Sequence, residues 1–210
     1  MLAVGGHSIS EVEILNVQGS KLAKKSFIEA KIDNKIQNCV THLDWSCESG
    51  LLALNFEASE LKYTAISHRK GTLATTSVKD VKWYTWTCTF GPPVQGTTTN
   101  SDGKHLLSAC RSRNQTLVAT SDEFGRVNLF RYPCIDQKSN PKSYKGHCSG
   151  VTKVRFLDND NYCVSTGGHD KSIILWETDV NSSKTQTDKK QHGTDLLGIF
   201  NHPSGAKQHR

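Results

Sequence analysis

The sequence predicts an all-β fold built from small repeated sheets, and three observations lead to this prediction. Short runs of β-branched, aromatic and other apolar residues alternate with polar turns along most of the chain. One block recurs, because Leu117–Phe130 aligns without gaps with Cys163–Trp176, about 46 residues later. The apolar content is only 35%, which suits short, half-buried strands. A repeat of this length falls within the range of one β-propeller blade.

The clearest repeat begins at Gly146-His147 and ends at Trp176-Glu177. Two β-type runs, Val151–Phe156 and Tyr162–Thr166, follow the Gly-His pair. A Gly-Gly-His-Asp turn and a third run, Ser172–Trp176, complete it. This order is typical of one WD-type propeller repeat. Since propeller blades stack and bind, the pattern favours binding over catalysis.

The predicted strands sort into about three and a half blades of a partial WD-type β-propeller. In chain order they are Leu2–Gly5, Val12–Val17 and Ser26–Ala30 (first blade); Val40–Trp45, Leu51–Asn55, Leu61–Ile66 and Thr72–Ser77 (second); His105–Cys110, Thr116–Ser121, Arg126–Arg131 and Lys142–Lys145 (third); and Val151–Phe156, Tyr162–Thr166 and Ser172–Trp176 (fourth). The first blade lacks an inner strand, and the fourth shows no outer strand. We therefore expect exposed apolar faces and self-association through the incomplete blades.

Two segments depart from the blade pattern. Residues 78–103 combine Trp, Tyr and Thr, which predicts an extra β hairpin or an elongated strand, followed by a loop from Pro92-Pro93. From Thr178 onward the chain is rich in Asn, Ser, Lys, Gln and Asp, which predicts disorder; Leu196–Phe200 is an isolated apolar stretch within it. The expected organisation is a partial propeller over residues 1–177 and a disordered tail over residues 178–210.

The composition narrows the class of partner. The net charge of +6 is spread along the chain, so it favours acidic partners weakly and falls short of a nucleic-acid-binding surface. Trp83, Tyr84, Trp86 and Phe90 could stack on bases, but few basic residues accompany them, so packing between strands is favoured. No apolar run approaches the roughly 18–20 residues that span a membrane. The seven scattered cysteines, none in a C-x-x-C pair, favour reduced thiols in an intracellular protein.

The sequence contains no motif for an enzyme, a cofactor or a metal. Phosphate-binding, dinucleotide-binding, nucleophile-elbow and zinc-protease patterns are all absent from it. His147-Cys148 and the pair Cys163 and His169 come nearest to a metal site but lack the paired ligand spacing of a zinc site. We therefore expect a non-catalytic protein without a cofactor.

Several longer elements resemble the C-terminal part of the echinoderm microtubule-associated protein-like (EML) family. They are Thr41–Ser46, Lys79–Trp83, Thr85–Cys88, Val127–Cys134 and the repeat that begins at His147, in this order. The match extends from residue 1 to about residue 177. The resemblance implies a cytoskeletal scaffold that binds tubulin or microtubules in the cytoplasm. The alternative is a generic WD-repeat adaptor in another complex, such as one for ubiquitin ligation or signalling.

The resemblance to WD-repeat proteins also implies a structural hydrogen-bonded set, namely His147, Ser165, Asp170 and Trp176. The alternative is a catalytic Asp-His pair, but the motif itself places no nucleophile beside it. In the third blade, Phe124 stands at the position that matches Asp170, so we expect that blade to lack the buried Asp.

Overall fold

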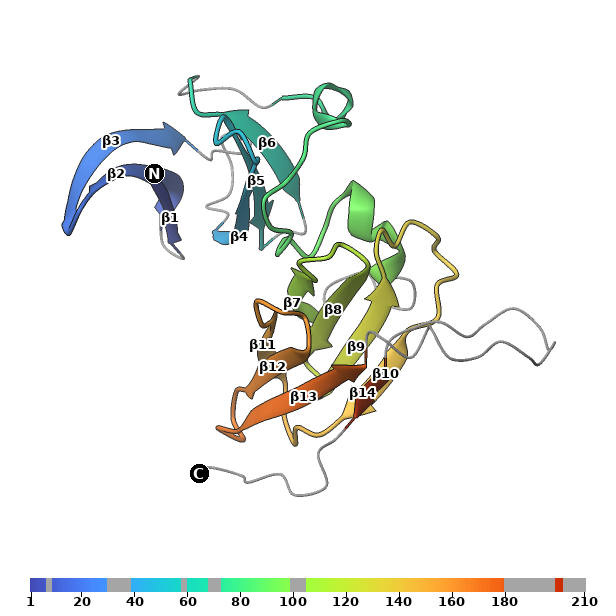
Figure 1. Cartoon of the computed structure of the whole chain (residues 1–210). Coiled ribbons are helices and arrows are strands. Elements are labelled where there is room, and N and C mark those ends of the chain that lie inside the picture. Colours follow the sequence, from blue (N-terminus) through green and yellow to red (C-terminus); the bar gives the residue numbers. More distant parts are fainter. Residues whose placement is uncertain are drawn as a thin grey trace. The chain divides into compact units, whose positions relative to one another are not determined.

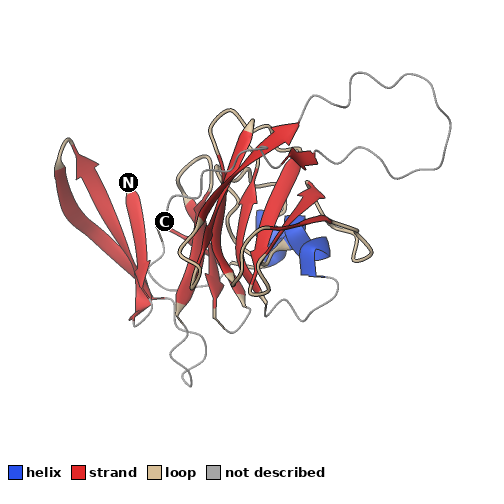
Figure 2. Ribbon diagram, turned by 90° about the horizontal axis from the view of Figure 1, so that it is seen from below, coloured by secondary structure: helices blue, strands red, loops and turns tan. Residues whose placement is uncertain are grey.

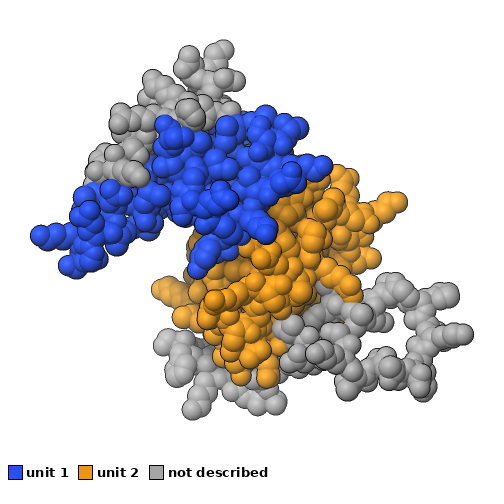
Figure 3. All heavy atoms as spheres, turned by 45° about the horizontal axis from the view of Figure 1, so that its top comes forward, with its two compact units in different colours: residues 1–90 blue, residues 91–210 orange. Residues whose placement is uncertain are grey.

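The computed structural model of this chain describes residues 1–6, 9–29, 39–57, 60–67, 73–98, 105–179 and 199–201 (Figure 1). Within these residues the chain forms four antiparallel sheets of three or four strands, each a simple up-and-down meander. Strands dominate and helical structure is confined to short turns (Figure 2). The all-β prediction is therefore confirmed. The chain divides into two compact units, residues 1–90 and 91–210, which are coloured separately in Figure 3 and described in turn.

The first unit holds the first two sheets. The first sheet contains β1 (Leu2–Gly6), β2 (Ile9–Gln18) and β3 (Lys21–Glu29), and the second contains β4 (Val40–Trp45), β5 (Leu51–Phe56) and β6 (Leu61–Ala65). The long hairpin of β2 and β3 curves away from β1 in Figure 1. Its two-residue turn contains Gly19 at φ 60°, a left-handed conformation that glycine adopts without steric cost.

Alternation of apolar residues explains how these two sheets pack. Ala3, Val12 and Ile14 lie on one face of the first sheet, since Ala3 pairs with Ile14 across β1 and β2. They form one core with apolar residues of the second sheet, which are Val40, Leu52, Leu54 and Phe56. Neighbouring blades of a propeller pack face to face in this way.

The second unit holds two four-stranded sheets. The third sheet contains β7 (Leu106–Arg111), β8 (Leu117–Asp122), β9 (Arg126–Arg131) and β10 (Lys142–Lys145). The fourth contains β11 (Val151–Phe156), β12 (Tyr162–Gly167), β13 (Ile173–Asp179) and β14 (Ile199–Asn201). The two sheets share a core that joins β8 and β9 to β11, β12 and β13; its buried members are Cys110, Leu117, Ala119, Val127, Leu129, Val151, Val154, Cys163 and Trp176.

Most strands of the third and fourth sheets begin and end within one residue of the predicted bounds, and the last one extends to Asp179. The expectation that the fourth blade has no outer strand is wrong, because Ile199–Asn201 pairs with Glu177–Asp179 as β14. A three-residue strand after a long polar stretch carries too little periodicity to be recognised in a sequence. The other residues beyond Asp179, 180–198 and 202–210, lie outside the described residues.

Two predictions for the first unit fail. The expected strand Thr72–Ser77 is not formed in its described part, where Leu73 makes one isolated bridge to Tyr63 and Thr75–Val78 forms the 3-10 helix η1. No strand of an extra hairpin forms in the described part of residues 78–103. Apart from a single bridge between Trp83 and Ser46, this segment is irregular until the 3-10 helix η2 (Pro92–Thr98). Side chains of the second sheet hold it in place, as shown below.

Candidate functional site

The four residues that were predicted as a hydrogen-bonded set come together in the fourth sheet. His147 lies in the loop between β10 and β11, Ser165 on β12, and Trp176 on β13. The Nε2 atom of His147 is 2.7 Å from the Ser165 hydroxyl oxygen, which also accepts a 2.8 Å hydrogen bond from the indole N–H of Trp176. The Nδ1 atom of His147 is 3.2 Å from a carboxylate oxygen of Asp170, in the β12–β13 turn.

A single direction of donation satisfies every member of this set. With the proton of a neutral His147 assigned to Nδ1, Trp176 donates to Ser165, Ser165 donates to His147, and His147 donates to Asp170. Such a chain is strong in a buried site, because each bond polarises the next one. The set therefore ties the loop before β11 to the middle of the sheet.

Gly146 lets this loop approach the sheet closely. A Cβ atom on Gly146 would lie 2.9 Å from the side chains of Ile174 and Trp176, which is closer than real Cβ contacts. Only glycine fits at this position without a shift of the indole. The Gly-His pair of the sequence thus combines Gly146, which allows close packing on the sheet, with His147, which forms hydrogen bonds to it.

Asp170 organises the turn through its hydrogen bonds. It accepts from the backbone N–H of Cys148 at 3.0 Å and from that of Ser172 at 3.2 Å. Partial desolvation opposes its charge. The two backbone N–H groups, together with Ser172 and His147, outweigh this effect and lower the pKa of Asp170 below its ordinary value. Ser172 is a member of the network that the sequence did not reveal, and its hydroxyl lies 2.9 Å from His147 Nδ1.

The order Ser165, His147 and Asp170 has the connectivity of a hydrolase triad, contrary to the expectation that no nucleophile lies beside the Asp-His pair. Ser165 is, however, 0% exposed, and its oxygen already accepts the Trp176 bond. A nucleophile must reach its substrate, and this hydroxyl lies within the sheet. The arrangement is suited to holding a turn and not to attacking a substrate.

The third sheet holds its own buried carboxylate, contrary to the expectation from Phe124. Asp122, two residues earlier, is buried and accepts hydrogen bonds from the backbone N–H groups of Phe124 at 2.9 Å and Arg126 at 3.0 Å. It also accepts a 2.7 Å bond from Nε of Arg126. A gapless alignment missed Asp122, because the pairing of β8 with β9 is offset by one residue from that of β12 with β13.

A second buried carboxylate, in the first unit, was not predicted. Asp44 on β4 accepts three hydrogen bonds, at 2.6 Å from the Thr85 hydroxyl, 2.7 Å from the N–H of Thr87 and 2.8 Å from the N–H of Cys88. On β5, Asn55 bonds the N–H and the carbonyl of Phe90. In the sequence, Asp44 alternates with Leu43 and Trp45, which is typical of a solvent-facing position, so the sequence carries no signal of this burial.

The hydrogen bonds of Asp44 and Asn55 explain how the aromatic segment from Trp83 to Phe90 is held without forming strands. Trp83 and Trp86 are buried and meet edge to face, with ring centroids 5.9 Å apart. Tyr84 alone of the four aromatic residues named for base stacking is largely exposed, at 76%. These four residues therefore form no continuous exposed row of aromatic rings, and Trp83 and Trp86 serve as packing residues.

Asp160 links the third sheet to the fourth. It lies in the β11–β12 turn and accepts 2.7 Å hydrogen bonds from the backbone N–H groups of Arg113 and Asn114, in the β7–β8 turn. The nearby pair of Arg113 and Asp158 adds an exposed ion pair. Charged hydrogen bonds to backbone donors are among the stronger ones in proteins, so this contact fixes the edges of the two blades together.

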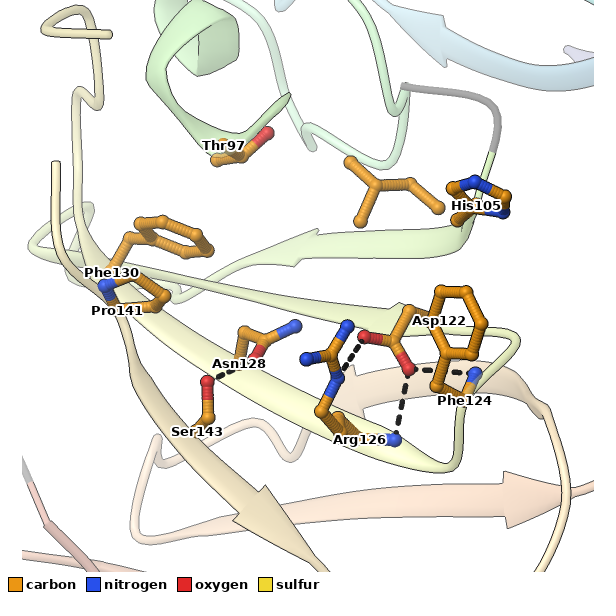
Figure 4. A pocket seen from close by; sticks show the side chains of 10 residues that line it. Thr97, His105, Asp122, Phe124, Arg126, Asn128, Phe130, Pro141 and Ser143 are labelled. Carbon is orange, nitrogen blue, oxygen red and sulfur yellow. Dashed lines mark hydrogen bonds and ion pairs between the residues drawn. The ribbon is translucent and has the colours of Figure 1, made fainter. Parts of the chain in front are cut away.

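A polar cavity of about 310 Å³ lies on the third sheet, on the face opposite the shared core (Figure 4). Its floor comes from β8, β9 and β10, and Thr97 of η2 lies across from them. The residues that line it are Thr97, His105, Leu106, Asp122, Phe124, Arg126, Asn128, Phe130, Pro141 and Ser143. None of the four residues of the His147 set contributes to it.

The described residues contain no cluster of three or more His, Cys, Asp or Glu side chains that could hold a metal ion. Among the same residues, no helix is long and apolar enough to cross a membrane.

In comparison with known proteins, the matching family model and the similar proteins carry the same family name. The family model described as "Echinoderm microtubule-associated protein second beta-propeller" matches residues 1–178. Echinoderm microtubule-associated protein-like 1 of Rattus norvegicus is 41% identical over 138 residues, which cover 65% of this chain and 17% of that protein. Echinoderm microtubule-associated protein-like 4 of Xenopus laevis is 35% identical over 190 residues, or 90% of this chain and 20% of the relative. The 77 kDa echinoderm microtubule-associated protein of Strongylocentrotus purpuratus is 40% identical over 138 residues, or 65% of this chain and 20% of the relative.

The chain thus spans about a fifth or less of the length of these relatives. The match to a propeller model, together with four sheets of three or four antiparallel strands, confirms the prediction of a partial β-propeller. Because the family model matches residues 1–178, most of the chain, this chain belongs to the echinoderm microtubule-associated protein-like family.

Proposed function

We propose that this chain is a non-catalytic propeller segment that binds microtubules and acts as a cytoskeletal scaffold in the cytoplasm. The observation that carries the proposal is the match of residues 1–178 to a propeller of a family whose members are named for association with microtubules. Binding would use exposed loops and blade faces, with the buried networks as the supporting scaffold.

The chemistry of the buried polar groups supports a non-catalytic function. His147, Asp170 and Ser165 satisfy one another, and Asp44 and Asp160 are used by backbone donors of neighbouring loops. Polar groups consumed in this way stabilise turns and are not available to a substrate. We also propose the division expected from the sequence, a propeller region over residues 1–177 followed by a tail over residues 178–210, with the amendment that Thr178, Asp179 and β14 of this tail join the fourth sheet.

Co-sedimentation with polymerised tubulin tests the proposed function. The 210-residue chain should appear in the pellet in a saturable manner when microtubules are present. A matched sample without microtubules measures pelleting caused by self-association alone. Equal pelleting in both samples would reject microtubule binding and leave a WD-type adaptor of another complex as the function to pursue.

The dependence of binding on salt tests its electrostatic part. The net charge of +6 favours an acidic partner. Attraction between exposed charges weakens as the Debye length falls from about 10 Å at 0.1 M salt to about 3 Å at 1 M. The bound fraction should therefore fall steeply between these salt concentrations. Binding that is insensitive to salt would instead indicate an apolar contact.

A further inference from the structure

The cavity on the third sheet differs from the equivalent face of the fourth sheet. Asn128 and Phe130 on β9 lie opposite Thr120 and Val118, and all four side chains share one face. On β13, 46 residues later, Ile174 and Trp176 occupy the corresponding positions. In the fourth sheet the Trp176 indole and His147 fill this face. In the third sheet the same face is hollow, and polar side chains line it.

The carboxylate in this cavity is already occupied. Asp122 is buried and accepts three hydrogen bonds, from the N–H groups of Phe124 and Arg126 and from Nε of Arg126. Because a carboxylate has about four acceptor sites, little of it is left for a ligand. Asp122 therefore orients the guanidinium of Arg126 and does not itself bind a ligand.

The donors that remain lie next to each other on β9, on the face that lines the cavity. The Nε atom of Arg126 is committed to Asp122 at 2.7 Å, which leaves the two terminal nitrogens of the guanidinium. With the amide of Asn128 in its assigned orientation, its oxygen accepts a hydrogen bond from the Ser143 hydroxyl and its nitrogen is the donor on the cavity side. Figure 4 shows both groups pointing from β9 toward the side on which Thr97 lies.

Apolar surfaces complete the walls. The Phe124 ring lies 5.3 Å from the guanidinium of Arg126 and 5.0 Å from the ring of His105, to which it is tilted by 50°. Phe130 and Pro141 close the other end. The contact with the Phe124 ring and the hydrogen bond to Asp122 restrain Arg126 and keep its terminal donors oriented before any ligand arrives.

We propose that this cavity binds a carboxylate carried on a short apolar stem. A planar guanidinium with two free nitrogens matches the two oxygens of a carboxylate, and Asn128 supplies a third donor. The volume of about 310 Å³ is at the lower end for ligand sites, so it admits one small group of this kind. The glutamate side chain of an acidic peptide and a free dicarboxylate share this chemistry. The inference does not depend on the proposed binding to microtubules.

Equilibrium dialysis of the 210-residue chain tests the proposal, since it is valid whatever the oligomeric state. The probes are radiolabelled glutarate and a capped Gly-Gly-Glu-Gly-Gly peptide, with neutral glutaramide as the control ligand. We expect saturable binding of one carboxylate probe per chain. Binding of the peptide supports a side-chain ligand, and binding of glutarate alone supports a free dicarboxylate. Equal binding of glutaramide, or no saturable binding of either carboxylate at millimolar concentration, would overturn the proposal.

Three variants locate the site. Arg126→Gln removes the charged donor, and Asn128→Asp replaces a donor by an acceptor of the same shape while keeping the bond from Ser143. Each should weaken binding about tenfold or more, because a hydrogen bond to a charged group is lost. Lys145→Gln removes an exposed cation on β10 outside the cavity and should leave binding unchanged. Circular dichroism confirms folding of each variant. Full binding by a folded Asn128→Asp variant, or an equal loss in Lys145→Gln, would refute the site.

Discussion

The third and fourth sheets have the same pattern of apolar residues on one face but bury it to different extents. On the third sheet, Val127 and Leu129 are 0% exposed beside Leu117 and Ala119. On the fourth, the corresponding Ile173 and Leu175 are 67% and 45% exposed, beside Tyr162 and Val164. Residues of equal hydrophobicity are thus core in one blade and surface in the next.

This difference in burial comes from the presence or absence of a neighbouring sheet and not from the sequences of the strands. The inner strand β11 of the fourth sheet packs Val151 and Val154 onto the third sheet and excludes water from it. Among the described residues, no sheet packs in the same way on Ile173 and Leu175. An alternating strand pattern therefore shows which face can be buried, and only the presence of the next blade decides whether it is.

The largest expected effect concerns the exposed face of the fourth sheet, which we propose as a site of self-association. Contiguous apolar patches of this kind usually mark contact sites. The 210-residue chain should therefore elute as an oligomer, and the double variant Ile173→Lys/Leu175→Lys should shift it toward the monomer in light scattering coupled to size exclusion. The control Gln137→Lys/Asn140→Lys adds the same charge in the β9–β10 loop. An oligomer that persists in the first variant but not in the control would place the contact elsewhere.

A matched pair of truncations tests the difference in burial directly. Leu129→Ala removes a buried side chain and should destabilise the chain by about 2–5 kcal/mol, which includes the cavity that it leaves. Leu175→Ala, at the corresponding position, should cost less than about 1 kcal/mol, because much of the side chain already contacts water. Thermal unfolding at low protein concentration, followed by circular dichroism, measures both. Equal losses would mean that another chain buries the fourth-sheet face.

The polar network of the fourth sheet gives a smaller effect. Asp170→Ala should lower stability by about 1–3 kcal/mol, because His147 and the N–H groups of Cys148 and Ser172 would lose their acceptor. The network then predicts partial rescue by Asp170→Asn, which keeps one acceptor oxygen. Denaturant unfolding of the three proteins checks the order. An Asp170→Ala variant of unchanged stability that no longer binds its partner would make Asp170 a contact residue.

The sequence predicted the strands that recur from blade to blade, and it missed the contacts that occur in only one blade. Strands β7–β13 are short β-type runs between polar turns, so their bounds were predictable within a few residues. The His147 set was located by resemblance, because its residue types and order recur in WD repeats. Asp44 and Asp160 were missed, since each bonds backbone groups of another segment, and backbone donors have no sequence identity. Asp122 bonds backbone groups of its own turn and was missed because the two repeats differ by one residue in strand register. β14 was missed because strand pairing at an edge needs only backbone groups.

The smallest expected effect is the dependence of the Asp170 contribution on pH. The pKa of Asp170 is lower in the folded chain than its ordinary value of 3.8. A carboxylate whose pKa is lowered by folding stabilises the folded state at pH values above its pKa in the unfolded chain. This contribution is lost as the pH falls through its lower pKa in the folded chain. The stability difference between the wild-type chain and Asp170→Asn should thus stay constant from pH 7 to about pH 5 and narrow below about pH 4. Urea titrations at each pH measure it. A difference that does not narrow between pH 4 and pH 2 would mean that the charge of the Asp170 carboxylate adds nothing to the stability of the folded chain.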